Sequence, residues 1–170
     1  MPADFAVLIR ALVTHDVRFV VIGGAALILH GSSYITEDID LAFERTRANA
    51  ERIVAALKPF RPRPRGFPAD LPFVFDAQTI VSGQILTLQT SIGAVDLLGE
   101  VPGVGTFTDV WAQSEICTDD GMTFRILSID ALIATKRTAN RPKDQPGLLE
   151  LEALKQARSM ERDDEGPKPS

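Results

Sequence analysis

The feature that most constrains this chain is the order of its first segments. Residues 18–22 form an apolar, β-branched run that ends at Gly23-Gly24, and residues 25–30 favour a short helix. Residues 38–43 then alternate acidic and apolar side chains, which is the spacing of a strand. The sequence therefore predicts a buried strand, a glycine turn, a helix and a second strand with acidic groups on one face.

The acidic face of the second strand predicts a metal site. Asp38 and Asp40 are two residues apart, so their carboxylates project to the same side, while Ile39 and Leu41 point into the core. Two adjacent carboxylates repel each other unless a cation lies between them. Ligand sets made only of oxygen suit Mg²⁺ or Mn²⁺.

A third carboxylate stands in an otherwise apolar strand predicted over residues 94–98. Asp96 lies between Val95 and Leu97, where a lone carboxylate is costly unless it is paired or binds metal. If this strand lies beside that of Asp38, three carboxylates converge and can hold two metal ions. The glycines at 23 and 24 add a helix start where phosphate can approach backbone N–H groups. Together these features indicate phosphoryl chemistry.

The rest of the chain completes a mixed α/β (α+β) pattern with C-terminal helices. The sequence predicts helices at 4–15, 47–57, 109–113, 129–139 and 145–159, two strands around a turn within residues 79–98, and a hairpin at Asp119-Asp120-Gly121. The stretch 59–72 reads as a Pro-rich connector, and its Arg61, Arg63 and Arg65 are expected to be solvated, with phosphate or RNA contact as the lesser alternative.

Length and charge set the wider bounds. A chain of 170 residues fits a single domain, predicted here over residues 1–160 with a disordered charged tail at 161–170. A single cysteine and the lack of a signal-peptide or membrane-span pattern predict a cytoplasmic protein. The net charge of −5 disfavours broad, nonspecific nucleic-acid binding.

Several runs of the sequence resemble the DNA polymerase beta-type nucleotidyltransferase superfamily. The first match is Val21-Ile22-Gly23-Gly24 followed, after a short helix, by Asp38-Ile39-Asp40-Leu41, with His30-Gly31 and Thr36 between them. Further matches are Val95-Asp96-Leu97-Leu98, the helix through Lys136, and Arg141-Pro142-Lys143-Asp144. The set is similar to small bacterial members, including toxins of toxin–antitoxin pairs and antibiotic-modifying enzymes.

The resemblance implies a nucleotidyltransferase fold with a mixed central sheet flanked by helices. It also implies metal-dependent transfer of a nucleoside monophosphate from an NTP to an acceptor hydroxyl on tRNA, protein or a small molecule. Asp38, Asp40 and Asp96 would be the catalytic carboxylates and the ligands of Mg²⁺ or Mn²⁺. The implied nucleotide-binding residues are Gly23, Gly24, Thr36, Lys136 and Lys143.

One position departs from the family pattern. Many relatives carry Arg three residues after His-Gly, and this chain has Tyr34, which cannot bind phosphate in the bidentate manner of Arg. The alternative hypothesis is therefore a weak or inactive nucleotidyltransferase fold that acts through a small protein partner. A metal-dependent phosphohydrolase would need a histidine cluster, which the two histidines of the chain do not supply.

Overall fold

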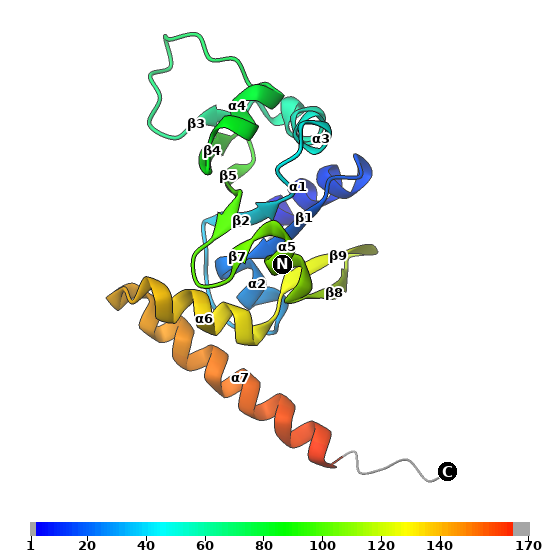
Figure 1. The fold of residues 1–170 in the computed structure, drawn as a ribbon, viewed down its shortest axis with the longest axis vertical. Coiled ribbons are helices and arrows are strands. Elements are labelled where there is room, and N and C mark those ends of the chain that lie inside the picture. Colours follow the sequence, from blue (N-terminus) through cyan, green and yellow to red (C-terminus); the bar gives the residue numbers. More distant parts are fainter. Residues whose placement is uncertain (1–2, 165–170) are drawn as a thin grey trace.

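The computed structural model describes residues 3–164, and its centre is a mixed seven-stranded sheet (Figure 1). The sheet strands are β1 (Phe19–Ile22), β2 (Asp38–Phe43), β3 (Arg63–Pro64), β4 (Ile85–Thr90), β5 (Gly93–Leu98), β8 (Ser114–Asp119) and β9 (Met122–Leu127). Their spatial order is β3-β4-β5-β2-β1-β9-β8. Two further short strands, β6 (Glu100–Val101) and β7 (Gly105–Thr106), pair separately.

Helices flank this sheet, and two of them form the C-terminal part of the described chain. The α-helices are α1 (Ala3–Thr14), α2 (Gly23–Leu29), α3 (Arg47–Leu57), α4 (Ala77–Ser82), α5 (Phe107–Ala112), α6 (Ile129–Ala139) and α7 (Gln145–Asp164), and the 3-10 turns are η1 (Lys58–Phe60) and η2 (Pro142–Asp144). Within residues 3–164, none of these helices is long and apolar enough to cross a membrane. The predicted mixed α/β class is confirmed.

The middle of the sheet aligns the acidic strands. β2 pairs antiparallel with β1 and parallel with β5, and the second register places Asp40 opposite Asp96. Because side chains alternate along each strand, residues paired in this register share a face. Adjacent strands thus bring carboxylates that are far apart in the sequence to one point.

The opposite face of the same strands forms part of the hydrophobic core. Ile39 and Val95 are completely buried, and Leu41 and Leu97 are about as enclosed, at 1% exposure. Burial of such side chains contributes about 1.5–3 kcal/mol each to folding. The alternation of core and acidic residues fixes the register, since a slip of one residue would bury the carboxylates and expose the aliphatic chains.

Two predictions in the middle of the chain were wrong in detail. The first of the two strands expected within residues 79–98 begins only at Ile85, because residues 77–82 form helix α4. Asp76 caps this helix by accepting a 2.8 Å hydrogen bond from the backbone N–H of Thr79. The Pro-rich connector contains the short edge strand β3, whose Arg63 pairs with Gln89 of β4.

The C-terminal helices are joined by a tight connection. Ser128 caps the start of α6, and Asn140 ends it in the left-handed conformation with φ 45°. Arg141 and the η2 turn then lead directly into α7. The last helix continues to Asp164, beyond the predicted end at Ser159 and into the range predicted as a tail, and residues 165–170 lie outside the described part of the chain.

Candidate active site

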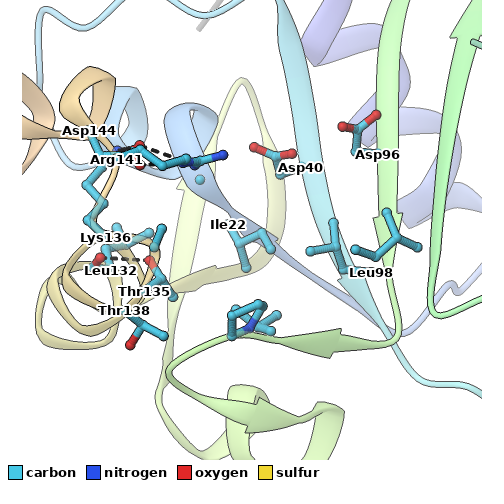
Figure 2. A pocket seen from close by; sticks show the side chains of 15 residues that line it. Ile22, Asp40, Asp96, Leu98, Leu132, Thr135, Lys136, Thr138, Arg141 and Asp144 are labelled. Atoms are coloured by element: carbon cyan, nitrogen blue, oxygen red, sulfur yellow. Dashed lines mark hydrogen bonds and ion pairs between the residues drawn. The ribbon is translucent and has the colours of Figure 1, made fainter.

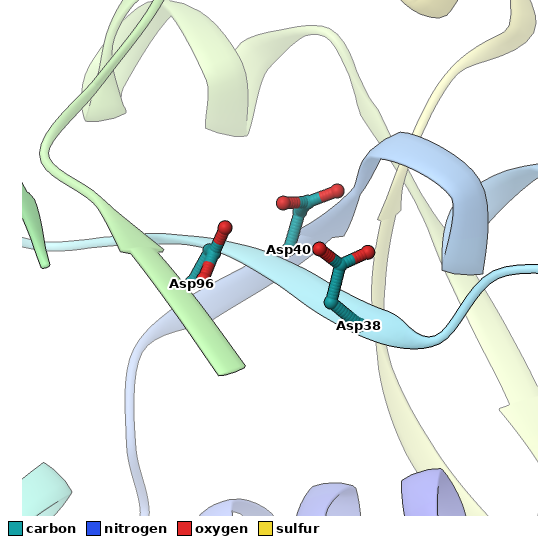
Figure 3. A group of neighbouring side chains, drawn as sticks. All are labelled: Asp38, Asp40 and Asp96. Carbon is teal, nitrogen blue, oxygen red and sulfur yellow. The ribbon is translucent and has the colours of Figure 1, made fainter. Parts of the chain in front are cut away.

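Three carboxylates converge on one side of the sheet, as the sequence predicts. Asp38 and Asp40 project from β2 and Asp96 projects from β5 (Figure 3). One oxygen from each lies within 4.8 Å of the others, which is close enough for a shared metal ion. The geometric requirement of the three-carboxylate hypothesis is therefore met, and the assignment of catalytic roles stays a prediction.

The electrostatics of this cluster are those of a site that needs a cation. Burial raises the pKa of Asp40 to about 7, and the negative charges of Asp38 and Asp96 add to the rise. Burial also raises the pKa of Asp96, although the guanidinium of Arg65 opposes the shift. A divalent cation would favour the ionised carboxylates, because opposite charge stabilises them.

Thr36 holds the first carboxylate in place. Its hydroxyl donates to Oδ1 of Asp38 at 3.0 Å and lies 3.1 Å from the Asp38 carbonyl oxygen. The hydroxyl thus orients a carboxylate at the point where the chain enters β2. The predicted contact of Thr36 with nucleotide stays a prediction beside this observed contact.

The glycine pair allows two close approaches. Gly23 has a left-handed φ of 61°, and a side chain on it would collide with the Asp40 carboxylate. A Cβ on Gly24 would lie 2.9 Å from the Cβ of Thr36 and 3.0 Å from the Tyr34 ring. Both glycines lie in the first turn of α2, and Gly23 lines the adjoining cavity. Their contact with a triphosphate stays a prediction.

A cavity of about 420 Å³ separates the acidic groups from a basic wall (Figure 2). Asp40 and Asp96 line one side, and Lys136 and Arg141 line the other. Figure 2 shows Arg141 extending toward Asp40. The floor is apolar and includes Ile22. The cavity can thus accept a ligand that combines a cation-binding group, several negative charges and an apolar part.

Asp144 fixes both cations of the basic wall. Its carboxylate accepts from Nε of Arg141 at 2.6 Å and lies 3.4 Å from Nζ of Lys136. Burial alone would raise the pKa of Asp144, but its bonds to Arg141 and Lys136 hold that pKa below its usual value. The hydrogen bond from Lys136 to Asp144 thus joins α6 to the η2 turn.

Arg141 lines the site although the sequence analysis assigned it no role there. It belongs to the Arg-Pro-Lys-Asp run that carries the family resemblance, so a signal was present without an assigned role. Tyr34 lies on the same side, with Nζ of Lys136 5.6 Å from the centre of its ring. The position of Tyr34, where the resembled family pattern has Arg, thus has the cation of Lys136 beside it. The side chain of Lys143 lies outside the described part of the structure.

Arg65 is exposed, as expected, but its guanidinium also contacts the acidic centre. Its Nη2 lies 2.6 Å from Oδ1 of Asp96, and its Nη1 lies 3.8 Å from Oδ2 of Asp38. Arg65 follows edge strand β3, and its backbone N–H donates to the carbonyl of Thr87 on β4 at 2.9 Å. Strand pairing between distant segments brings this arginine to the acidic centre, so the local sequence of the connector could not reveal it.

Two solved structures share this fold. A candidate nucleotidyltransferase from Thermotoga maritima has a TM-score of 0.51 at 15% identity, with 96% of this chain and 91% of that chain covered. The antibiotic-resistance factor ANT(2″)-Ia has a TM-score of 0.50 at 17% identity, with 95% and 93% covered. No protein-family model matches the sequence, and no curated protein matches it significantly. The prediction of a nucleotidyltransferase fold is confirmed.

Proposed function

We propose that this protein is a metal-dependent nucleotidyltransferase that transfers a nucleoside monophosphate from an NTP to an acceptor hydroxyl. The observation that carries the proposal is the convergence of Asp38, Asp40 and Asp96 within 4.8 Å. The cavity beside them supports it, because its opposite wall carries Lys136 and Arg141. Acidic groups facing basic groups across one cavity are suited to a metal-bound polyphosphate.

The residues present fit a divalent cation. All three candidate ligands are carboxylates, and the pKa of Asp40 is raised to about 7 by burial and by the neighbouring charges of Asp38 and Asp96. Oxygen-only sites of this kind suit Mg²⁺ or Mn²⁺. When bound, the cation would neutralise charge on the phosphates and favour the ionised form of an acceptor hydroxyl.

The residues of the chain have distinct proposed roles in the transfer. The acceptor oxygen forms a bond to the α-phosphorus, and the bond from that phosphorus to the pyrophosphate oxygen breaks. Asp96 accepts the proton of the acceptor hydroxyl. Lys136 and Arg141 bind the pyrophosphate as negative charge develops on it, held in position by Asp144.

Arg141 argues against the alternative hypothesis, in which the protein is an inactive module that only binds a protein partner. A guanidinium that extends toward Asp40 supplies the positive charge that Tyr34 cannot, while its Nε and Nη2 are held by Asp144. We therefore favour an enzyme over an inactive binding module. The toxin-like role, an antitoxin-like protein partner and the cytoplasmic location are proposals drawn from the resemblance and the sequence. Growth arrest on expression that Asp38→Ala abolishes would support the toxin-like role.

The function is tested by incubating the purified protein with each α-labelled NTP, Mg²⁺ or Mn²⁺, and a cell extract. We expect label to enter a macromolecule or small molecule, and we expect Asp38→Ala to abolish it. The matched control is Glu37→Gln, which removes one negative charge from an exposed neighbour and should retain labelling. Absence of labelling together with absence of a thermal shift from NTP and metal would refute the proposal.

A further inference from the structure

We propose that the acceptor is the single-stranded end of a nucleic acid, bound along edge strand β3. The inference rests on the proposed function and names the substrate class of the same site. It starts from charge: residues 52–69 carry five basic side chains and no acidic one, within a chain of net charge −5. These basic residues are Arg52, Lys58, Arg61, Arg63 and Arg65. Such a local excess attracts phosphates even when the whole chain is acidic.

The sheet places two of these residues, Arg63 and Arg65, on the face that carries Asp96. Arg63 pairs with Gln89, and Arg65 lies across from Thr87, which in turn pairs with Asp96. Alternation along the paired strands therefore directs Arg63 and Arg65 to the same face as Asp96. The contact between Arg65 and Asp96 confirms this direction at one end of the segment.

A second cavity of about 400 Å³ adjoins this segment. Arg61, Arg63 and Phe67 line it together with the hydroxyl residues Thr90 and Ser91. Pro64 and Gly66, the neighbours of Arg65 in the chain, also line it, and Arg65 itself contacts Asp96 in the acidic centre. Gln89 in its wall is two residues along β4 from Thr87, which is about 7 Å at the usual rise of a strand.

The side chains of this cavity match the two needs of single-stranded nucleic acid, which are backbone charge and base stacking. Among residues 3–164, neither Arg61 nor Arg63 forms an ion pair with a carboxylate, so their positive charges are not neutralised. Nη2 of Arg63 donates to the carbonyls of Pro68 and Leu71 at 2.9 and 2.7 Å, which orders the loop around its guanidinium. The Arg63 guanidinium lies 5.7 Å from the centre of the Phe67 ring, and Phe67 is 37% exposed. Arginine beside an exposed aromatic ring forms a stacking platform that tolerates any base.

The backbone of Arg61 gives independent support. This residue has a φ of 52°, the left-handed conformation that glycine or asparagine adopts more readily. It ends the η1 turn, where a glycine would relieve the conformational cost. An arginine in that position costs stability, which is the pattern expected of a functional side chain.

The test measures binding of a labelled single-stranded RNA of about 12 nucleotides, a length typical of such surfaces, with matched DNA as a second probe. We expect the wild type to bind and Arg61→Gln with Arg63→Gln to weaken binding by about tenfold or more. The slope of log affinity against log salt should fall by about 1.4, or 0.7 for each lost phosphate contact. A preference for RNA or DNA would show whether the acceptor strand carries ribose or deoxyribose, and binding of either supports the proposal.

Matched variants separate this site from the fold and from the active centre. Arg10→Gln removes one positive charge near the far edge of the sheet, where Arg10 pairs with Asp120, and should leave RNA binding unchanged. Phe67→Ala should weaken binding about tenfold, whereas Val74→Ala in the same loop should not. Arg61→Gly should fold at least as well as the wild type and still bind RNA more weakly.

The outcome also distinguishes this proposal from the proposed function. Thermal shift with NTP and Mn²⁺ reports the nucleotide site, and Arg61→Gln should leave it unchanged. A protein that binds NTP and Mn²⁺ but gives the same RNA affinity with and without Arg61 and Arg63 would overturn the nucleic-acid acceptor alone. RNA binding that depends on these arginines, without any NTP binding, would uphold the RNA site and refute the transferase.

Discussion

The carboxylate of Asp40 lies against the backbone of Gly23, in the space that a side chain on Gly23 would occupy. β1 and β2 bring the two residues together, because Ile22 at the end of β1 pairs with Asp40. The left-handed φ of Gly23 turns the chain at this point into α2. The position of Asp40, one of the three candidate metal ligands, therefore depends on a residue without a side chain.

Gly23→Ala should displace Asp40 and weaken Mn²⁺ binding by about tenfold or more, because the added methyl and the ligand compete for one space. The left-handed backbone alone should cost about 1–2 kcal/mol of stability. Metal affinity is measured by electron paramagnetic resonance of free Mn²⁺, and stability by urea unfolding.

Gly121→Ala is the control for backbone strain. Gly121 has a φ of 71°, and a Cβ there would meet nothing within 4 Å. This variant should lose similar stability and keep its affinity for Mn²⁺. Equal loss of metal binding in both variants would show that strain, rather than the contact with Asp40, explains the effect.

Protonation of Asp40 should make metal binding depend on pH. Its pKa of about 7 in the metal-free protein means that a proton must leave before the carboxylate can bind a cation. Affinity for Mn²⁺ should therefore rise about tenfold per pH unit up to about pH 7 and level off above it. Titration calorimetry at several pH values checks this, and a flat profile from pH 5 to pH 8 would contradict it.

The same shift predicts how stability varies without metal. The folded state holds a proton on Asp40 that the unfolded chain has lost between pH 4 and about pH 7, so stability falls as pH rises through this window. The loss is up to about 4 kcal/mol. Asp40→Asn should flatten the curve, whereas Glu37→Gln should not, when urea unfolding is followed in the presence of EDTA.

Thr36 gives a prediction about orientation. Thr36→Val keeps the shape of the side chain but removes the hydrogen bond to Asp38, so Mn²⁺ affinity should fall by about 10-fold or less. Thr36→Ser restores the hydroxyl and should restore the affinity. If the serine variant binds as weakly as the valine variant, the loss of hydrogen bonding to Asp38 does not explain the effect.

Local patterns predicted strand β2 and the side of it on which its carboxylates lie. The alternation at residues 38–43 determines both which side chains are buried and which face carries Asp38 and Asp40. Asp96 stood out because a carboxylate is costly in an apolar strand. These conclusions depend on one strand at a time, which is the scale on which sequence patterns are informative.

The parts of the site that were missed depend on contacts between distant segments. Arg65 reaches Asp96 only because β3 pairs with β4 and β4 with β5. Helix α4 was mistaken for a strand because its six residues include β-branched Thr79, Ile80 and Val81, while its start depends on a cap from Asp76. The Arg141 side chain is oriented by its place just after α6 and by its ion pair with Asp144.

Asp144 should control nucleotide affinity without touching the nucleotide. It is only 7% exposed and holds Lys136 and Arg141 at the cavity, so Asp144→Asn leaves two cations without their shared counter-ion. NTP affinity should fall by about tenfold or more, while Mn²⁺ affinity in the absence of NTP stays within about twofold. Stability should fall by about 3–5 kcal/mol, the usual cost of removing one partner from a buried ion pair.

A nearby ion pair supplies the control for this last variant. Arg137 follows Lys136 on α6 but is exposed and pairs with Glu152 at 2.8 Å. Glu152→Gln removes that partner and should change stability by about 1 kcal/mol or less and NTP affinity not at all. If Asp144→Asn loses stability but binds NTP as well as Glu152→Gln does, Asp144 stabilises the helix junction and does not position the cations.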